Sequence, residues 1–596
     1  MILRKIHEIL NDVEKPARYI GNEYNQILKD PSKIRLRVGL LFPDVYEVGM
    51  SNLGLAIIYD VLNEMEYVWA ERVFMPWIDM MNLMKKRSIP LFTLESKTPV
   101  KNLDVLGVSL QHELLYTNVL KALELAGIPL LAEERSNADP IILAGGPCTV
   151  NPEPIAPVFD AVVIGDGESV VQEISKCLIE TKGANRKDRL KALSQIEGVY
   201  IPMFYDNSTP PKPISHDIPE RVRRRIEQNI ERQLTKRIIP HIQLVHDRIS
   251  VEVMRGCTRG CRFCQAGFVY RPVREKKSSS IFFEITKTLL CTGYEEIGLL
   301  SLSSADHSNI SMIIERLKDL SETNLISVSI PSTRLDAFGI TLANNVGGAR
   351  RTGLTFAPEA GTQRLRNVIN KDISDEDFIK SLEIAKKHGW RRVKLYFMIG
   401  LPTETDEDLE GIVSMAKTAK KIGFEHVTLS IATFIPKPHT PFQFAEQKNL
   451  DYFKHAENIL RQAKKFAKVN FHNPSMSLIE GVLSRGDRKV FSALIKAHQM
   501  NACFDSWENI FDQEKWLKSF ELTGLQVEKY LRSRSPHESL PWDHIDTGVD
   551  KKFLISEFEK AMRAETTPDC RWNGCQACGV CNSIVKNTLE KHAESH

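Results

Sequence analysis

The stretch Met254-Arg-Gly-Cys257-Thr-Arg-Gly-Cys261-Arg-Phe-Cys264 decides the fold of the surrounding chain. It carries three cysteines with the spacing CxxxCxxC, directly after a β-like run at residues 249–253. Three thiolates in one short loop can hold a cubane iron–sulfur cluster by three of its four irons, which leaves the fourth iron open to a small molecule. The alternative is a zinc site, although structural zinc normally has four protein ligands. We therefore expect Cys257, Cys261 and Cys264 to bind a 4Fe–4S cluster.

The motif resembles the signature of the radical S-adenosylmethionine (radical SAM) enzymes. In those enzymes the open iron binds the amino and carboxylate groups of S-adenosylmethionine. One electron from the cluster then cleaves the sulfonium and yields a 5′-deoxyadenosyl radical. The resemblance implies S-adenosylmethionine as a cofactor and a low-potential electron donor, such as flavodoxin or ferredoxin, as a partner.

Composition narrows the class of protein further. The 596 residues suggest roughly three to four domains, and 42% hydrophobic with 26% charged residues is ordinary for a soluble globular protein. A net charge of +3 indicates no dominant electrostatic partner. The charged N-terminus lacks a signal-peptide core, and no run reaches the roughly 18 to 20 apolar residues of a membrane span. We expect a cytoplasmic protein with no membrane partner.

Changes of pattern along the chain predict an α/β protein with five segments. They are an N-terminal helix at 1–30, a Rossmann-like domain of cobalamin-binding type at 31–185, a linker at 186–245, a partial (β/α)6 radical SAM barrel at 246–470, and a helical C-terminal region at 471–596. Strands and helices alternate in the second segment, which predicts a parallel sheet with helices on both faces. Ligands of such sheets bind beyond the carboxyl ends of the strands.

Three loops follow predicted strands of this second segment: Ser109-Leu-Gln111, Gly145-Gly146 and Gly165-Asp-Gly167. They resemble the loops of the Rossmann-like cobalamin-binding domain that precedes many radical SAM domains. The resemblance implies that Ser109, Gly145 and Gly146 contact cobalamin. The motif Asp-x-His-x-x-Gly, whose histidine ligates cobalt from below, is absent, so no such histidine is expected; His112 is interpreted as a surface or core residue. The alternative is a scaffold that has lost the cofactor or binds another ligand.

Prolines break the expected linker, and its charged run at residues 221–225 lies in a stretch interpreted as helical. Acidic residues interleave with the arginines, which favours a solvated helix face over a nucleic-acid patch.

Six strands can be read in the fourth segment, at residues 250–254, 297–302, 326–331, 354–357, 392–399 and 426–433. Six β/α units predict a partial barrel, and the sites of such barrels gather at the carboxyl ends of the strands. The cysteine loop follows the first strand, so we expect it at that rim.

Other rim segments match those of radical SAM enzymes. The resemblance implies that Ser303 and Asp306 meet the amino group of S-adenosylmethionine, Glu359 its ribose, Arg364 its carboxylate and Gly400 its adenine. The alternative for Glu359 is a structural role, in which its carboxylate lies at a helix N-terminus and is favoured by the helix dipole. The Pro-rich sequence at residues 434–443 resembles that of radical SAM enzymes related to the methylthiotransferases. We expect His439 to fix the conformation of this loop rather than to act as an acid or base.

A second cysteine cluster lies near the C-terminus, at Cys570, Cys575, Cys578 and Cys581. Four thiolates form a complete ligand set, and the CxxCxxC portion resembles ferredoxin loops. We expect an auxiliary 4Fe–4S cluster; zinc is the alternative. Electron relay, substrate anchoring and structural support are all open as its role. For the polar run at residues 480–488, ion pairing and substrate contact are equally open.

The whole chain resembles bacterial radical SAM proteins with an N-terminal cobalamin-type domain and a Cys-rich tail. The expected activity is cleavage of S-adenosylmethionine for cobalamin-assisted methylation or another radical modification. Two alternatives are sulfur insertion into RNA or protein, as in methylthiotransferases, and a non-catalytic iron–sulfur protein that binds RNA or the ribosome. The substrate class, whether RNA, protein or small molecule, does not follow from the sequence.

Overall fold

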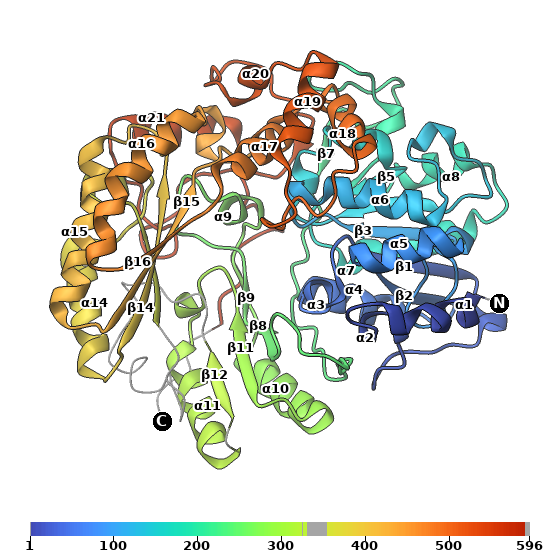
Figure 1. Cartoon of the computed structure of the whole chain (residues 1–596), viewed down its shortest axis with the longest axis horizontal. Helices are drawn as coiled ribbons and strands as arrows, with labels where there is room; N and C mark the ends of the chain where they lie inside the picture. Colours follow the sequence, from blue (N-terminus) through green and yellow to red (C-terminus); the bar gives the residue numbers. More distant parts are fainter. Residues whose placement is uncertain (1, 325, 330–353, 591–596) are drawn as a thin grey trace.

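Two α/β lobes face each other, and helices from the C-terminal region connect them (Figure 1). The computed structural model describes residues 2–324, 326–329 and 354–590. Parallel sheets dominate both lobes, which confirms the expected fold class. A search of the described residues for a helix long and apolar enough to cross a membrane finds none.

The N-terminal lobe is built on a six-stranded sheet with the order β2-β1-β3-β4-β5-β6. All neighbouring strands run parallel except β5 and β6. The strands are β1 Leu36–Phe42, β2 Val68–Phe74, β3 Val105–Ser109, β4 Ile141–Gly145, β5 Ala161–Val163 and β6 Val199–Tyr200. Its main helices are α4 Leu53–Glu64, α5 Ile78–Arg87, α6 Tyr116–Ala126 and α7 Glu168–Glu180. The predicted alternation is therefore confirmed.

The sequence of strand β2 does not have the apolar pattern of a buried strand. Its centre carries Glu71 and Arg72, yet both are buried, with 0% and 2% of their surface exposed. Arg72 forms ion pairs with Glu95 at 2.6 Å and with Glu23 at 2.9 Å. Charges in a buried strand are tolerated when they are paired, so a hydrophobic pattern alone does not reveal such a strand.

Two expectations for the first 245 residues are wrong. Residues 1–30 do not form one helix but the short helices α1 Ile2–Ile9 and α2 Ala17–Ile20, with a 3-10 turn and extended chain around them. Residues 221–225 are not helical: β7 Val222–Arg223 pairs with β17 Ile545–Asp546, and Arg224 is only 2% exposed. The interleaved charges pair across the fold, as in Arg232–Asp60 at 2.6 Å, rather than along a helix.

The second lobe is a half-barrel made of two parallel sheets, β12-β11-β8 and β13-β14-β15-β16 (Figure 1). Its strands are β8 Ile249–Glu252, β11 Glu296–Leu300, β12 Ser327–Ser329, β13 Leu354–Glu359, β14 Arg392–Ile399, β15 His426–Thr433 and β16 Lys468–Phe471. All six predicted strands are present, and β16 adds a seventh. The end of the third predicted strand, at residues 330–331, lies outside the described residues. Helices α10 Ser278–Thr292 and α15 Asp406–Ile422 cover the outer faces (Figure 1).

The C-terminal region is helical, as expected. Its helices are α17 Pro474–Arg485, α18 Val490–Gln499, α19 Gln513–Thr523, α20 Val527–Leu531 and α21 Lys551–Met562. Ile479, Val482 and Trp516 from this region share one buried core with the N-terminal sheet. Arg488 pairs with Glu153 at 2.7 Å across the same contact. The C-terminal helices therefore complete the N-terminal lobe and join it to the barrel.

Candidate functional site

The cysteine loop lies at the rim of the half-barrel, between β9 Met254–Arg255 and α9 Gln265–Val269. Gly256 has φ +83°, and a Cβ there would lie 2.4 Å from the Pro272 carbonyl oxygen, so only glycine fits this turn. The Gly267 N–H donates to Cys264 Sγ at 3.3 Å. The loop thus follows the first barrel strand, which confirms its predicted place at the rim.

The three thiols lie within electrostatic reach of one another. Burial and the thiols of Cys261 and Cys264 raise the pKa of Cys257 to about 12. Burial and Cys261 likewise raise the pKa of Cys264 to about 11. Crowded, buried thiolates repel one another unless a cation compensates them, and metal binding displaces their protons. The donor set therefore fits an iron–sulfur cluster with one iron free of protein ligands.

Glu359 and Lys371 border the same loop. Lys371 lowers and Glu359 raises the pKa of Cys264, so both charges act on that thiol. Their side chains pair at 3.5 Å. Glu359 has φ +70°, which is unusual for a residue with a side chain and is found mostly where function requires a strained backbone. Glu359 thus lies beside the cysteine loop, while its contact with a ribose stays a prediction; Lys371 is a neighbour of the loop that sequence reasoning did not select.

Ser303, Asp306 and Gly400 are also at the rim. Ser303 is 1% exposed, and its Oγ has no hydrogen-bond partner within the described part of the chain. The Arg259 Nε donates to Asp306 at 2.9 Å, which ties Asp306 to the cysteine loop. Gly400 has φ +85° and donates its N–H to Glu404 at 2.5 Å. Their contacts with a bound ligand remain predictions, and Ser303 offers a free hydroxyl for one.

Arg364 and His439 have other partners. The Arg364 guanidinium pairs with Asp408 and donates to the Thr403 carbonyl at 2.9 Å, and its side chain is 43% exposed. Its role toward a carboxylate stays a prediction that this geometry does not favour. His439 is buried and its Nε2 lies 3.0 Å from the Val150 carbonyl oxygen. Burial lowers the pKa of His439 to about 4, which fits a histidine that fixes its loop.

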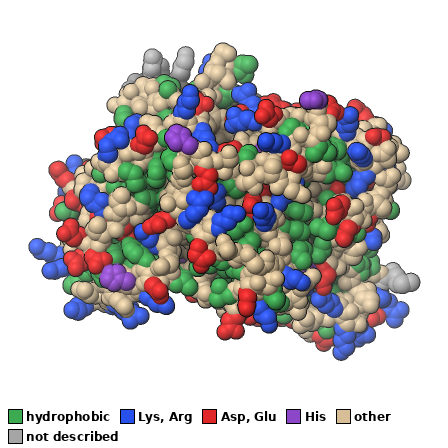
Figure 2. Space-filling view, turned by 90° about the horizontal axis from the view of Figure 1, so that it is seen from above, with side chains coloured by type: hydrophobic (Ala, Val, Ile, Leu, Met, Phe, Trp, Pro, Cys, Tyr) green, Lys and Arg blue, Asp and Glu red, His purple; other side chains and the backbone are tan. Residues whose placement is uncertain are grey.

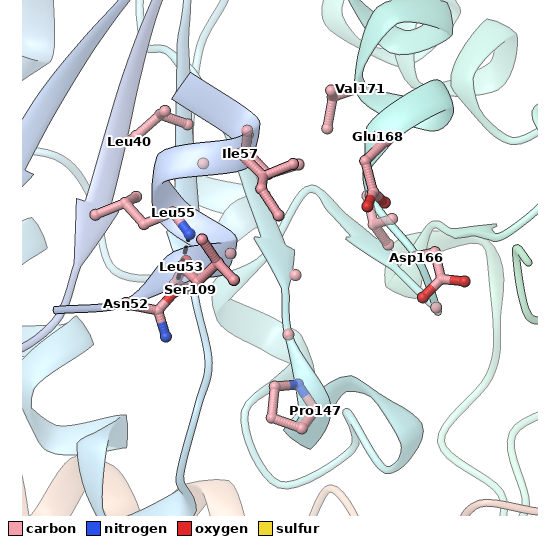
Figure 3. Close-up of a pocket in the computed structure, with 18 of the residues that line it drawn as sticks. Leu40, Asn52, Leu53, Leu55, Ile57, Ser109, Pro147, Asp166, Glu168 and Val171 are labelled. Atoms are coloured by element: carbon pink, nitrogen blue, oxygen red, sulfur yellow. Dashed lines mark hydrogen bonds between the residues drawn. The ribbon is translucent and has the colours of Figure 1, made fainter. Parts of the chain in front are cut away.

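A cavity of about 480 Å³ lies between the two lobes. Figure 3 shows Ile57 of α4 and Val171 of α7 facing this space, with Ser109 and Pro147 at the strand ends. Gly145 and Gly146 line it too, and Leu36, Val38 and Leu40 form its apolar floor. Arg255 and Gly256 close it from the barrel side. The cavity therefore reaches the residue that precedes Cys257.

The lining of the cavity is chemically compatible with a corrinoid. Its rim consists of glycine-containing loops at the carboxyl ends of parallel strands, where a large planar ring can approach the backbone. Its deeper part is apolar and runs between α4, α7 and the sheet. None of the described residues that line it is a histidine, which agrees with the missing cobalt-ligand motif. A second cavity of about 410 Å³ shares Leu53, Glu168 and Arg255 with it.

Asp166 of the N-terminal lobe connects the wall of this cavity to the barrel through two ion pairs. Its carboxylate lies 3.1 Å from Arg255 Nη1 and 2.6 Å from Arg274 Nη1, and both arginines belong to the barrel. The Glu227 N–H donates to it at 2.9 Å. Asp166 was visible in the sequence as part of a turn, but its two distant partners were not.

We expect Asp166→Asn to lower the free energy of unfolding by about 3 kcal/mol, since it leaves the buried Arg274 guanidinium without its carboxylate partner, whereas Arg255 keeps Glu168 and Glu252. Burial alone would raise the pKa of Asp166, but Arg255 and Arg274 lower it to about 2. The contribution of Asp166, about 2 kcal/mol, is therefore lost as the pH falls from about 4 to 2, and the variant lacks this part of the pH dependence. Urea unfolding at several pH values measures both effects. The exposed Glu134→Gln is the control, and an equal change in both variants would contradict the assignment.

The four C-terminal cysteines line a separate cavity of about 320 Å³. The opposite wall of this cavity includes Thr258, Arg259 and Gly260, which lie between the first two cysteines of the rim loop. Burial and the thiols of Cys578 and Cys581 raise the pKa of Cys570 to about 11. Cys570, Cys575, Cys578 and Cys581 therefore all line this cavity, and their binding of one metal or cluster stays a prediction.

A third group of residues of the kinds that bind metals consists of His112, Glu113 and Glu480. The ammonium group of Lys437 lies among their carboxylates and forms ion pairs with them. Lys437 Nζ lies 2.8 Å from Glu113 and 2.7 Å from Glu480. His112 Nε2 lies 3.1 Å from Glu480, and its Nδ1 accepts the Leu114 N–H at 3.3 Å. This network ties the N-terminal lobe, a rim loop and α17 together, which supports ion pairing as the role of the run at 480–488.

Comparison with known proteins agrees with this geometry. The model described as "Radical SAM proteins, N-terminal" matches residues 54–202, and the model of the radical SAM superfamily matches residues 251–416. The half-barrel with a three-cysteine loop at its rim is the architecture expected of radical SAM enzymes, and it agrees with these matches. The chain belongs to the radical SAM superfamily.

Several relatives and one solved structure help to place it. An uncharacterized protein of Methanocaldococcus jannaschii is 27% identical over 510 residues, which are 83% of this chain and 98% of that protein. An uncharacterized methyltransferase of Pyrococcus horikoshii is 26% identical over 53% of this chain and 65% of its own length. A tRNA-2-methylthio-N(6)-dimethylallyladenosine synthase of Petrotoga mobilis is 24% identical over 37% of this chain and half of its own length.

The solved structure is that of the radical S-adenosylmethionine methyltransferase TsrM from Kitasatospora setae, with cobalamin and a 4Fe–4S cluster bound. It superposes with a TM-score of 0.50 at 12% sequence identity, over 68% of this chain and 74% of that chain. At this identity the likeness concerns the fold, and it confirms the arrangement of a Rossmann-like lobe beside a half-barrel.

Proposed function

We propose that this protein is a cytoplasmic radical SAM enzyme that uses a corrinoid to methylate its substrate. The observation that carries the proposal is that the glycine-rimmed cavity extends to the cysteine loop. Gly256 lines the cavity, and Cys257 is the next residue of the chain. A corrinoid in that cavity and S-adenosylmethionine at the cysteine loop would be neighbours. The methyltransferase name of the Pyrococcus relative and the cobalamin in the TsrM structure support this choice.

The residues of the chain have distinct tasks in this proposal. Cys257, Cys261 and Cys264 would hold the cluster, which supplies the electron for cleavage of S-adenosylmethionine when it is bound. Lys371 offers a cation for a carboxylate, and Ser303 offers a hydroxyl to the same ligand. The apolar floor of the cavity excludes water from its deeper part, and Asp166 holds the two lobes in register.

Ser303→Ala tests the ligand side of the rim. We expect the dissociation constant for S-adenosylmethionine to rise about threefold to tenfold, because one buried hydrogen bond contributes roughly 0.5–1.5 kcal/mol. Isothermal titration calorimetry on anaerobically reconstituted protein measures this change. Ser492→Ala is the control, because Ser492 lies on α18 of the C-terminal region and not on a rim segment. This variant should bind S-adenosylmethionine as the wild type does. An unchanged constant for Ser303→Ala would exclude this hydroxyl from the binding site.

The proposed function is tested by two measurements on anaerobically purified protein. The ultraviolet–visible spectrum should show iron–sulfur absorption together with that of a bound corrinoid. Incubation with S-adenosylmethionine and dithionite should yield 5′-deoxyadenosine, and mass spectrometry of candidate RNA, protein and small-molecule substrates should find an added methyl group. Absence of 5′-deoxyadenosine from fully reconstituted protein would refute radical chemistry, and absence of corrinoid would refute the methylation route.

We also propose that Cys570, Cys575, Cys578 and Cys581 hold an auxiliary iron–sulfur cluster. The cavity between them and the complete set of four thiols support it. Zinc is the alternative for the same ligands. Metal analysis of the Cys257/Cys261/Cys264→Ala variant distinguishes the two, since that variant should retain about four irons per chain if the proposal holds. One zinc and no iron would refute it.

Sulfur insertion is the second candidate function, and the likeness to tRNA methylthio synthases favours it. Those relatives are matched over only part of this chain, and four cysteines leave no iron of the auxiliary site open. A product heavier by a methylthio group would establish it. Figure 2 shows basic and acidic side chains interleaved on one face of the molecule, so this face supports no purely electrostatic RNA-binding role.

A further inference from the structure

We infer that the C-terminal cysteine site is the entry point for electrons, and that a flavodoxin- or ferredoxin-class protein docks on it. The inference rests on the proposed function of both cysteine sites. A reduced donor gives up one electron at the C-terminal site, and the electron passes to the site at the rim. There S-adenosylmethionine takes it up as its carbon–sulfur bond breaks, which yields methionine and the 5′-deoxyadenosyl radical.

The cavity lined by the C-terminal cysteines extends to the rim loop. All four C-terminal cysteines line the cavity of about 320 Å³, and Thr258, Arg259 and Gly260 line it from the rim loop. Those three residues stand between Cys257 and Cys261. Because the rate of electron transfer falls steeply with distance, a redox site on this wall is well placed to reduce its neighbour.

Exposure gives the direction of the path. Cys575 and Cys581 are exposed, whereas Cys257, Cys261 and Cys264 are partly buried. Trp572 and Ile584 stand beside the exposed cysteines with 64% and 79% of their surface accessible. Large exposed apolar side chains at a surface redox site are what a transient protein partner can cover. On the other side, the rim loop faces the ligand cavity, where cofactors would block a protein donor.

Buried contacts fix the distance between the two cysteine segments. The Asn370 amide donates to the carbonyl oxygens of Gly260 and Thr567, at 3.2 and 3.1 Å. Arg262 and Glu557, which are 0% and 2% exposed at their side chains, pair at 3.1 Å. Arg259 Nε lies 3.3 Å from Asp569, the residue before Cys570. A rigid connection of this kind keeps a transfer path constant during turnover.

The experiment compares a small reductant with a protein reductant. Dithionite can reach either site directly, whereas photoreduced flavodoxin must dock. Electron paramagnetic resonance reports reduction of the rim cluster, and 5′-deoxyadenosine reports its consequence. For Cys575→Ser/Cys581→Ser we expect the ratio of flavodoxin-driven to dithionite-driven reduction of the rim cluster to fall at least about tenfold. An unchanged ratio, or a wild type that takes no electrons from flavodoxin or ferredoxin, would overturn the inference.

Substitutions of exposed apolar residues test docking without removing any of the four cysteines. Trp572→Glu and Ile584→Glu should raise the KM for flavodoxin at least about tenfold while dithionite-driven cleavage stays within twofold of the wild type. Leu522→Glu on α19, 59% exposed, is the matched control and should change neither value. An unchanged KM in both test variants would refute docking at this surface. If dithionite yields no 5′-deoxyadenosine with the wild type, the proposed function fails, yet the resonance signal still tests electron entry.

Discussion

Replacing Cys257, Cys261 and Cys264 by alanine removes the rim cluster and lowers formation of 5′-deoxyadenosine by at least about a thousandfold, or ~4 kcal/mol in the barrier. The reason is that these thiolates are the only ties of that cluster to the chain in the proposed site. Product is quantified by chromatography after incubation with S-adenosylmethionine and dithionite. Iron content should fall by about four per chain in the same variant.

A matched triple variant controls for the loss of thiols. Cys177, Cys291 and Cys503 are also half-buried but lie apart from both cysteine clusters in the sequence. Their simultaneous replacement by alanine should leave iron content and cleavage near the wild-type values. Cleavage that survives in the Cys257/Cys261/Cys264 variant would show that the radical is not generated at the rim.

Gly145→Leu is expected to lower corrinoid binding at least about tenfold, or ~1.4 kcal/mol, with little change in thermal stability. Gly145 lines the large cavity, and a Cβ at this position would meet no atom within 4 Å, so a larger side chain extends into open space. Titration of the purified protein with hydroxocobalamin, followed by its absorption spectrum, measures the effect.

Gly145→Ala is the matched control, because it adds a single carbon and should bind corrinoid within about threefold of the wild type. Gly146→Ala is less suitable, since its Cβ would lie 2.7 Å from the Leu110 carbonyl oxygen and would disturb the backbone. If Gly145→Leu binds hydroxocobalamin as the wild type does, the cavity is not the corrinoid site.

Features with a local signature could be predicted from the sequence. The strands β14 and β15 coincide with their predicted ranges because apolar residues alternate or run together between clear turns. The rim position of the cysteine loop followed from its place after a strand. The rim glycine Gly400 and the carboxylate Glu359 likewise stand at the ends of strands, and both adopt positive φ values there.

Features that depend on distant partners could not be predicted. Strand β2 has no apolar signature, because Arg72 at its centre is neutralised by Glu23 and Glu95, which come from other elements. The run at 221–225 was read as a helix, yet its partner strand lies at residues 545–546. Nothing in local sequence shows that the C-terminal cysteines and the rim loop border the same cavity, because that proximity arises from the packing of α21 on the barrel.

The shared core of the N-terminal lobe and the C-terminal helices has a consequence for biosynthesis. Trp516 and Phe520 of α19 are buried in the same core as the first strands, so this lobe lacks part of its interior until about residue 520 has left the ribosome. At about 5–20 residues per second this takes roughly half a minute to two minutes. The N-terminal lobe therefore cannot complete its interior ahead of the half-barrel, and both lobes reach their final packing together, late in synthesis.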